Sequence, residues 1–318
     1  MSTVAAVVAP DDQGAAATSP HAPLWQIGTI VTGLRQSREV TDNIWQRGPN
    51  RRAPSREALA DVTRSLIETL FPRHYGRADI DNANLDAAVA NTLHVALDGL
   101  LEQVHRGLTF VADGAPTEQQ FDDAVAITQR FAAKLPEIRA TLVGDLRAAF
   151  VGDPAATSFP EILLGYPGMT ALIHHRIAHL LHQLGATLVA RLVAELAHSA
   201  TGIDIHPGAQ LGAGIFIDHG TGVVIGETAI VGDRVRIYQA VTLGARHFPT
   251  DAEGKVVKGN ARHPIIESDV IIYAGATILG RVVVGQGSTI GGNVWLTEDV
   301  PPNSFVTQAS LRSKISAR

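Results

Sequence analysis

The sequence contains no cysteine among its 318 residues. This absence excludes disulfides, thiolate metal ligands and a thiol nucleophile. Basic residues are also fewer than acidic ones: the sequence has 26 lysines and arginines and 31 acidic residues, for a formal net charge of −5. With no run of basic residues either, we expect no nucleic-acid-binding surface.

Long hydrophobic runs are missing as well. No segment approaches the roughly 20 apolar residues that a membrane-spanning helix needs, although hydrophobic residues make up 45 % of the chain. The partly apolar stretch from Ser2 to Pro10 lacks a basic start and is too short for a secretory signal. We therefore expect a cytoplasmic protein with no membrane contact.

The chain has three compositional zones before its short C-terminal tail at 306–318. Residues 1–54 are rich in Ala, Pro and Ser and predict a poorly ordered or extended segment, with a short helix near Thr29 to Ser37. Residues 55–200 have apolar side chains at three- and four-residue intervals, which predicts an α-helical domain. Ser55 is a plausible N-cap of its first helix. We expect breaks near Gly114, near Pro136 and at "GDPAATSFPE".

From residue 201 the hydrophobic period becomes six. The aliphatic residues that lead the hexads are Ile205, Leu211, Ile217, Ile225, Val231, Ile237, Leu243, Ile266, Ile272, Ile278, Val284, Ile290 and Leu296. Neither the helical nor the strand period explains a repeat of six, whereas a parallel β-helix does, with three hexads to each triangular coil. Residues 201–305 are therefore predicted to form this domain, with the leading aliphatics stacked inside it.

Two interruptions break the hexads: a two-residue slip that we place at Val223-Val224, and an inserted loop at 244–265. A solenoid core gains nothing from either, so we expect them to serve a site or a subunit contact.

Acidic and imidazole side chains gather near these interruptions. Asp204 and His219 are fifteen residues apart, which places them on neighbouring coils of about eighteen residues. A carboxylate beside His219 would fix the tautomer of the imidazole and stabilise its protonated form, as a general base requires. The alternative is that both residues only cap turns at the corners.

The residues around this pair resemble those of a known family. The stretches "DIHPGAQLGAGIFIDHGTGVVIGETAIVGDRVRIYQAVTLG", "RHPIIESDVIIYAGATILG" and "IGGNVWLTEDVPPNS" are similar to serine O-acetyltransferases, as is the upstream "GDPAATSFPEILLGYPGMTALIHHRIAHLLH". The resemblance is close over roughly residues 150–305. It implies an α+β fold in which an N-terminal α-helical domain precedes a left-handed parallel β-helix of hexapeptide repeats.

The resemblance also implies a role for each matching residue. His219 corresponds to the general base, Asp204 to its carboxylate partner, and His263 to a second active-site histidine near the substrate hydroxyl. In the substrate site, Asp153 and Asp218 match the acids that hold the serine ammonium, Pro154 adjoins the first of them, and Arg262 matches the group that receives the carboxylate. The positions that correspond to those along the coenzyme A arm are Ala245, Ala274 and Gly292.

The implied reaction is direct transfer of acetyl from acetyl-coenzyme A, a co-substrate, to L-serine, the first step of cysteine synthesis. Neither a tightly bound cofactor nor a metal is expected. In this family the site forms between adjacent β-helices, so the resemblance predicts a homotrimer or a dimer of trimers.

Some features depart from the family pattern. The inserted loop is long and charged, which resembles a subgroup with a long amino-terminal region. The end "TQASLRSKISAR" differs from the usual Gly-Val-Pro-Ala stretch. Family members that dock into O-acetylserine sulfhydrylase end in isoleucine, whereas this sequence ends in arginine, so we expect no such complex.

Other interpretations remain open on the sequence alone. A hexapeptide-repeat acyltransferase could act on homoserine, a sugar or another acceptor. A γ-type carbonic anhydrase would need a histidine trio that the repeats lack, and a plain scaffold would need no catalytic residue. His175 and His179 are one helical turn apart and could suggest a metal site, but no acidic third ligand is apparent, and a structural role is favoured.

Overall fold

The computed structural model describes residues 25–40, 51–76, 82–112, 115–247 and 249–308. The chain divides into two compact units, residues 1–48 and 49–318. The predicted short helix is present in the first unit as α1 (Ile27–Val40). Much of the predicted N-terminal segment, at 1–24 and 41–50, lies outside the described residues, and so does most of the tail, at 309–318.

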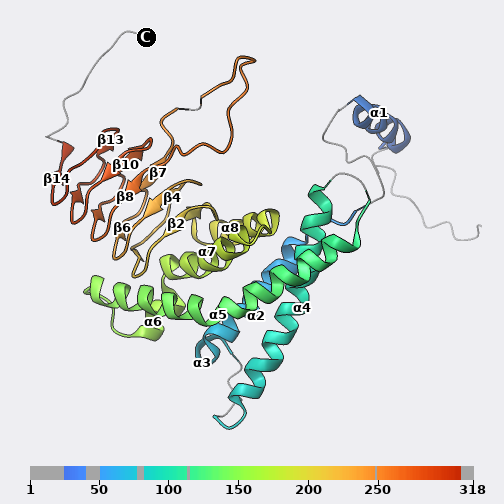
Figure 1. Cartoon of the computed structure of the whole chain (residues 1–318), viewed down its shortest axis with the longest axis horizontal. Coiled ribbons are helices and arrows are strands. Elements are labelled where there is room, and N and C mark those ends of the chain that lie inside the picture. The colour runs from blue at the N-terminus through green and yellow to red at the C-terminus, as the bar shows by residue number, and fades with distance from the viewer. Residues whose placement is uncertain (1–24, 41–50, 77–81, 113–114, 248, 309–318) are drawn as a thin grey trace, which may run out of the picture. The chain divides into compact units, whose positions relative to one another are not determined.

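The second unit begins with a layer of helices (Figure 1). They are α2 (Arg56–Leu70), α3 (Pro72–Tyr75), α4 (Leu85–Val111), α5 (Glu118–Gly152), α6 (Phe159–Gly165), α7 (Pro167–Gln183) and α8 (Thr187–Thr201). Ser55 caps α2 as predicted, with its hydroxyl accepting from the Ala58 amide at 3.2 Å. Helix α2 packs on α4, α4 on α5, and α7 on both α5 and α8. No helix in the described part of the chain has the length and hydrophobicity of a membrane span.

The predicted break near Pro136 is wrong, because α5 runs from Glu118 to Gly152 without interruption. A proline inside a helix removes one backbone hydrogen bond and costs about 3 kcal/mol. Helix α5 continues because Pro136 is on its exposed side, while Leu135 and Ile138 are buried in the core on the opposite side. Tertiary packing of that apolar face therefore outweighs the local preference of proline.

The rest of the unit is a left-handed parallel β-helix built from short strands. Their bounds are β1 (Asp204–Ile205), β2 (Gln210–Leu211), β3 (Phe216–Ile217), β4 (Val224–Ile225), β5 (Ile230–Val231), β6 (Arg236–Ile237), β7 (Thr242–Gly244), β8 (Ile265–Ile266), β9 (Ile271–Ile272), β10 (Thr277–Leu279), β11 (Val283–Val284), β12 (Thr289–Ile290), β13 (Trp295–Leu296) and β14 (Phe305–Val306). Figure 1 shows them stacked coil upon coil, away from α7 and α8.

The strands form the three faces of the coil. One sheet has the order β1-β4-β7-β10-β13, the second β2-β5-β8-β11 and the third β3-β6-β9-β12-β14. Every aliphatic residue predicted to lead a hexad points into the core, and all are buried except Leu211, which is partly buried in the first coil. The six-residue period thus predicted the inward-facing column correctly.

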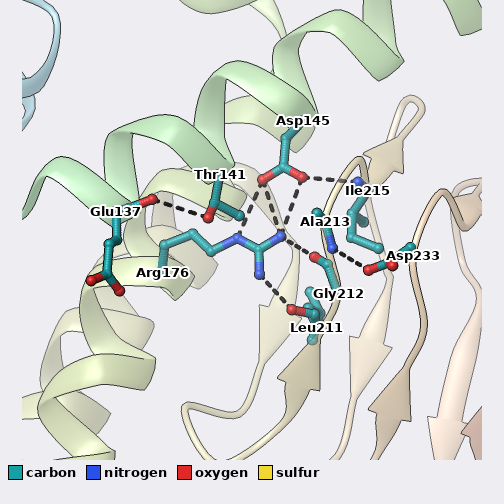
Figure 2. A network of polar contacts seen from close by, with 9 residues as sticks. All are labelled: Glu137, Thr141, Asp145, Arg176, Leu211, Gly212, Ala213, Ile215 and Asp233. Atoms are coloured by element: carbon teal, nitrogen blue, oxygen red, sulfur yellow. Dashed lines mark hydrogen bonds and ion pairs between the residues drawn. The ribbon is translucent and has the colours of Figure 1, made fainter. Parts of the chain in front are cut away.

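A buried ion pair fastens the helices to the first coil. Asp145 of α5 is fully buried and Arg176 of α7 is 9 % exposed, and their closest charged atoms, Arg176 Nη2 and Asp145 Oδ2, are 3.1 Å apart. The guanidinium also donates to the carbonyls of Leu211 and Gly212 at 2.6 Å, and the carboxylate accepts from the Ile215 amide at 2.9 Å (Figure 2). Two helices and one coil therefore share a single polar network.

Candidate functional site

His219 stands on a bulge of the coil between β3 and β4. Ile217 pairs with Ile237, twenty positions on, whereas Ile272 pairs with Ile290, eighteen positions on. The Asp218 amide donates to the Ile237 carbonyl, which keeps the offset of twenty. The Ala240 amide donates to the Thr221 carbonyl, which belongs to the offset of eighteen. The two additional residues are therefore His219 and Gly220.

This position corrects the predicted slip at Val223-Val224, since Val224 pairs normally with Thr242. The hydrophobic pattern reveals the slip only at the next inward-facing aliphatic residue. The backbone departs from the regular coil at His219, four residues before Val223. His219 has a φ of 58° and Gly220 a φ of 81°, the left-handed region that a tight outward turn requires. The His219 side chain is 70 % exposed on this turn, where it can reach a bound molecule.

Two acidic residues predicted for substrate binding lie beside His219. The Asp218 carboxylate is 3.9 Å from His219 Nε2. Asp153 follows the last turn of α5, where its carboxylate accepts from the Tyr166 hydroxyl at 2.6 Å and from the Ala155 amide at 2.8 Å. The Tyr166 hydrogen bond is the main cause that holds the pKa of Asp153 below its usual range, and attraction to His219 contributes. Pro154 forms the exposed turn after it.

Tyr166 is a residue of this group that the sequence reasoning missed. Its hydrogen bond to Asp153, and repulsion from further carboxylates that include Asp218, raise the pKa of Tyr166 to about 12. The tyrosine therefore remains a hydrogen-bond donor that keeps Asp153 ionised. In the sequence, the feature that could have identified Tyr166 is its position thirteen residues after Asp153, at the start of α7.

Asp204 lies one coil before this bulge, at the start of β1, where it pairs with Val224. Its carboxylate lies close to Glu195 and His198 at the end of α8, with one ligand atom of each residue within 4.8 Å of the others. These three side chains could together hold a divalent cation. Among the described residues, no hydrogen bond or ion pair joins Asp204 to His219, and its role as the partner of the base stays a prediction.

Arg262 and His263, at the end of the inserted loop between β7 and β8, form a second group against the next corner of the coil, at residues 226–229 between β4 and β5. Arg262 Nη2 donates to Glu227 at 2.6 Å, and the backbone amides of Arg262 and His263 donate to the Thr228 hydroxyl at 2.9 and 3.2 Å. His263 Nδ1 accepts from the Thr228 amide at 3.0 Å. Glu227 and Thr228, which no motif had singled out, thus hold the end of the inserted loop.

The two groups occupy different corners of the coil. Residues 218–222 precede β4 and residues 226–229 follow it, so the sheet that contains β4 separates them. The structure brings Asp153, Asp218 and His219 together, and separately brings Arg262 and His263 together. A single chain does not unite the predicted substrate-binding residues.

The positions predicted for coenzyme A lie along the two edges of the same sheet. Backbone hydrogen bonds continue the corner that carries His219 into the later coils: the Ala240 amide donates to the Thr221 carbonyl, the Gly275 amide to the Gln239 carbonyl, and the Asn293 amide to the Ala274 carbonyl. Ala274 and Gly292 therefore lie at the same corner of the coil as His219, in later coils. A Cβ at Gly292 would lie 3.2 Å from the Ala274 carbonyl, so the backbone there is tightly stacked. Ala245 follows β7 at the other edge, where the inserted loop begins.

Of the two α7 histidines considered as metal ligands, His175 is buried and His179 is partly buried. His175 is 2 % exposed, and its ring stacks on that of His179 at 5.5 Å. Burial holds the pKa of His175 well below its usual range. His179 Nδ1 lies 2.8 Å from the Pro207 carbonyl. These contacts favour a structural role for both histidines, and neither ring nitrogen of His175 has a hydrogen-bond partner among the described residues.

Comparison with known proteins agrees with this geometry. The family described as "Bacterial transferase hexapeptide (six repeats)" matches residues 263–298. The "Serine acetyltransferase, plasmid" of Synechococcus elongatus is 56 % identical over 301 residues, which cover 91 % of this chain and 92 % of that protein. The serine acetyltransferase of Mycobacterium tuberculosis is 50 % identical over 163 residues, 51 % of this chain and 67 % of the relative.

Solved structures show the same similarity. Entamoeba histolytica serine acetyltransferase 1 in complex with L-cysteine has a TM-score of 0.69 and 35 % identity, over 88 % of this chain and 97 % of that one. Soybean serine acetyltransferase complexed with serine has a TM-score of 0.51 and 31 % identity, over 80 % of this chain and 98 % of that one.

Proposed function

The chain belongs to the serine acetyltransferase family, and we propose that it transfers the acetyl group of acetyl-coenzyme A to the hydroxyl of L-serine, giving O-acetyl-L-serine and coenzyme A. The observation that carries this proposal is the convergence of Asp153, Asp218 and His219 on one bulge of the coil. Two carboxylates can hold an ammonium group there while the imidazole accepts a hydroxyl proton.

The bound serine is held at its two charged ends. Asp153 and Asp218 bind the ammonium, and hydrogen bonds from Tyr166 and the Ala155 amide keep Asp153 ionised for this purpose. Arg262 binds the carboxylate. A guanidinium has five N–H donors, so the contact of its Nη2 with Glu227 leaves donors for the substrate.

The transfer step uses His219 as general base. The imidazole takes the serine hydroxyl proton while the serine oxygen bonds to the thioester carbon, and the C–S bond then breaks. Protonated His219 returns the proton to the coenzyme A thiolate. Asp204 stabilises the imidazolium in this scheme. No acyl-enzyme forms and no metal takes part.

The complete site forms between two copies of the chain. The two groups of residues lie on opposite edges of one sheet, and a neighbouring protomer in a trimer can set its Arg262–His263 corner against the bulge of the first. Acetyl-coenzyme A lies along the same groove, where Ala245, Ala274 and Gly292 leave room for the pantetheine arm.

A thiol-release assay tests the proposal. Purified protein is given acetyl-coenzyme A with L-serine, L-homoserine or an amino sugar, and free coenzyme A is measured. We expect release that depends on L-serine and that falls roughly 10²- to 10⁴-fold in His219→Ala, which is the usual contribution of a general base. Preference for another acceptor would assign the chain a different acyl transfer, and full activity of His219→Ala would refute the role of the base.

A further inference from the structure

The tautomer of His263 is fixed by its surroundings. Its Nδ1 accepts from the Thr228 backbone amide at 3.0 Å, and the Thr228 hydroxyl lies 2.9 Å from the same nitrogen. A backbone N–H can only donate, so Nδ1 carries a lone pair and a neutral ring carries its proton on Nε2. Within the described residues, no protein group accepts from that Nε2–H, which leaves it available to a ligand.

Thr228 also fixes the position of the ring. Its hydroxyl accepts from the backbone amides of both Arg262 and His263. Arg281 Nη1 donates to the carbonyls of Thr228 and His263, at 2.6 and 3.0 Å, which joins the two segments a second time. The imidazole lies over Gly226, where a Cβ would be 2.1 Å from Cδ2 and Nε2. The ring therefore has one orientation.

The charges around His263 favour the neutral ring. It is 6 % exposed, and burial is the main cause that lowers its pKa to about 4, helped by the neighbouring charge of Arg262. Arg281 and His206 act in the same direction, and Glu227 opposes them. At neutral pH a ring of this kind is a hydrogen-bond donor rather than a proton acceptor, because Nδ1 is already occupied.

We propose that His263 donates its Nε2–H to the thioester oxygen that becomes negative during acetyl transfer, and that Thr228 is the positioning residue that holds it in this form. The inference rests on the proposed function and names an oxyanion donor for it. A fixed neutral donor aimed at developing charge is a strong source of transition-state stabilisation. Arg262 next to it already serves the permanent charge of the serine carboxylate.

His263 takes no part in the proton transfer of this reaction. His219 takes the hydroxyl proton, the O–C bond forms, and the carbonyl π electrons move to the oxygen that His263 contacts. When the carbonyl re-forms, the C–S bond breaks and the thiolate takes the proton from His219. His263 keeps its Nε2 proton throughout.

The first test reads the tautomer without any assay of activity. Nitrogen NMR of protein labelled with ¹⁵N-histidine, compared with His263→Gln to identify the signal, should show His263 with Nδ1 bare and Nε2 protonated between pH 6 and 8. A proton on Nδ1, or a charged ring at pH 7, would overturn the inference. Because this readout needs no substrate, it stands apart from failure of the wild-type enzyme to acetylate serine, which would refute the proposed function.

The second test separates a donor from a base. We expect His263→Ala to lower kcat about 10²- to 10³-fold, the usual effect of removing one oxyanion donor, with the KM for serine changed less than about threefold. The acidic limb of its pH profile should match the wild type, because His263 keeps its Nε2 proton throughout the reaction. Loss of that limb, or a higher KM with unchanged kcat, would contradict the assignment.

Thr228 variants test positioning. Thr228→Val removes the hydroxyl but keeps the backbone amide and the side-chain shape, and should lower kcat about tenfold, roughly the effect of one hydrogen bond. Thr228→Ser should restore most of the rate and the wild-type ¹⁵N signal. Ser268→Ala is the matched control, because this hydroxyl also accepts a backbone amide, that of Asp233 at 3.1 Å, on another corner. Equal losses of kcat in Thr228→Val and Ser268→Ala would show a purely structural role.

Discussion

At the scale of single residues, Gly226, Glu227 and Thr228 have three separate tasks at one corner. The glycine leaves room for the His263 ring, the glutamate pairs with Arg262, and the threonine fixes the imidazole tautomer. Their partners are some 35 positions away in the sequence. Residues of this kind are found only when the inserted loop is seen to return to the coil.

Gly226→Ala should separate folding from catalysis. The new Cβ would meet the His263 ring at 2.1 Å, and the ring can swing away more easily than the backbone can move. We expect kcat to fall about 10²-fold through loss of the donor, with unfolding free energy reduced by about 1–3 kcal/mol through overpacking. Steady-state kinetics and urea unfolding measure the two effects. Wild-type kcat would contradict the placement of the ring.

The low pKa of His263 predicts how stability depends on pH. The folded protein favours the neutral ring down to about pH 4, whereas the unfolded chain protonates it near 6.5. The contribution of His263 to the free energy of unfolding is therefore fully present above pH 6.5. It is lost as the pH falls towards 4, because the unfolded chain binds the additional proton. The loss amounts to at most about 3 kcal/mol.

Urea unfolding at pH 7 and pH 5 checks this expectation. Other buried histidines titrate in the same direction, so the comparison is with His263→Gln, which should lose less stability between the two pH values than the wild type. Equal losses in the two proteins would show that His263 does not contribute.

At the scale of elements, the β-helix could be predicted almost residue by residue, while the helices and the bulge could not. The hexad rule works because each leading aliphatic has one possible direction, inwards. Pro136 misled the prediction because buried neighbours in α5 outweigh a local preference. The bulge was misplaced because His219 and Gly220 leave no mark on the hydrophobic column.

Deleting His219 and Gly220 together should restore a regular coil. Asp218 would then be followed by Thr221 and Gly222, the same spacing as Tyr238, Gln239 and Ala240 in the next coil. We expect the circular dichroism spectrum to remain and the melting temperature to stay within a few degrees of the wild type, with no measurable acetyl transfer. An unfolded deletion protein, beside a folded His219→Ala control, would show that the bulge is needed for the coil itself.

The Asp145–Arg176 pair should be far more important to stability than its neighbours on the helix surface. Asp145→Ala leaves the buried guanidinium without a counter-ion, which should cost about 3–5 kcal/mol. Glu137→Gln, in the exposed pair with Lys134 on the same helix, should cost less than about 1 kcal/mol. Chemical denaturation of both variants gives the comparison, and similar values would contradict the structural role of the network.

At the scale of the whole molecule, the residues of the site could be predicted through their resemblance to a family, but their separation into two groups could not. Asp218–His219 and Arg262–His263 look equivalent in the sequence, and only the triangular coil shows that they lie on different corners. This arrangement makes the oligomer part of the catalytic proposal.

Mixed oligomers test whether neighbouring protomers share the site. Co-expressed His219→Ala and His263→Ala chains should recover about a quarter of the wild-type rate. The reason is that about three in four randomly formed trimers are mixed, and each of these has one intact site. Each variant expressed alone provides the control. No recovery in oligomers shown to be mixed would mean that one chain supplies both histidines.

The inserted loop also has a consequence for how the protein folds. Solenoid coils fold by adding to their neighbours, but between β7 and β8 the chain must first close a loop, with an entropic cost that grows by about 0.6 kcal/mol for each doubling of length. The backbone bond from the Ile230 amide to Pro264 forms only after that closure. His263 is next to Pro264, so it reaches its place only when the coils on both sides of the loop have joined. A chain stalled at this step would have its base in position but not its oxyanion donor.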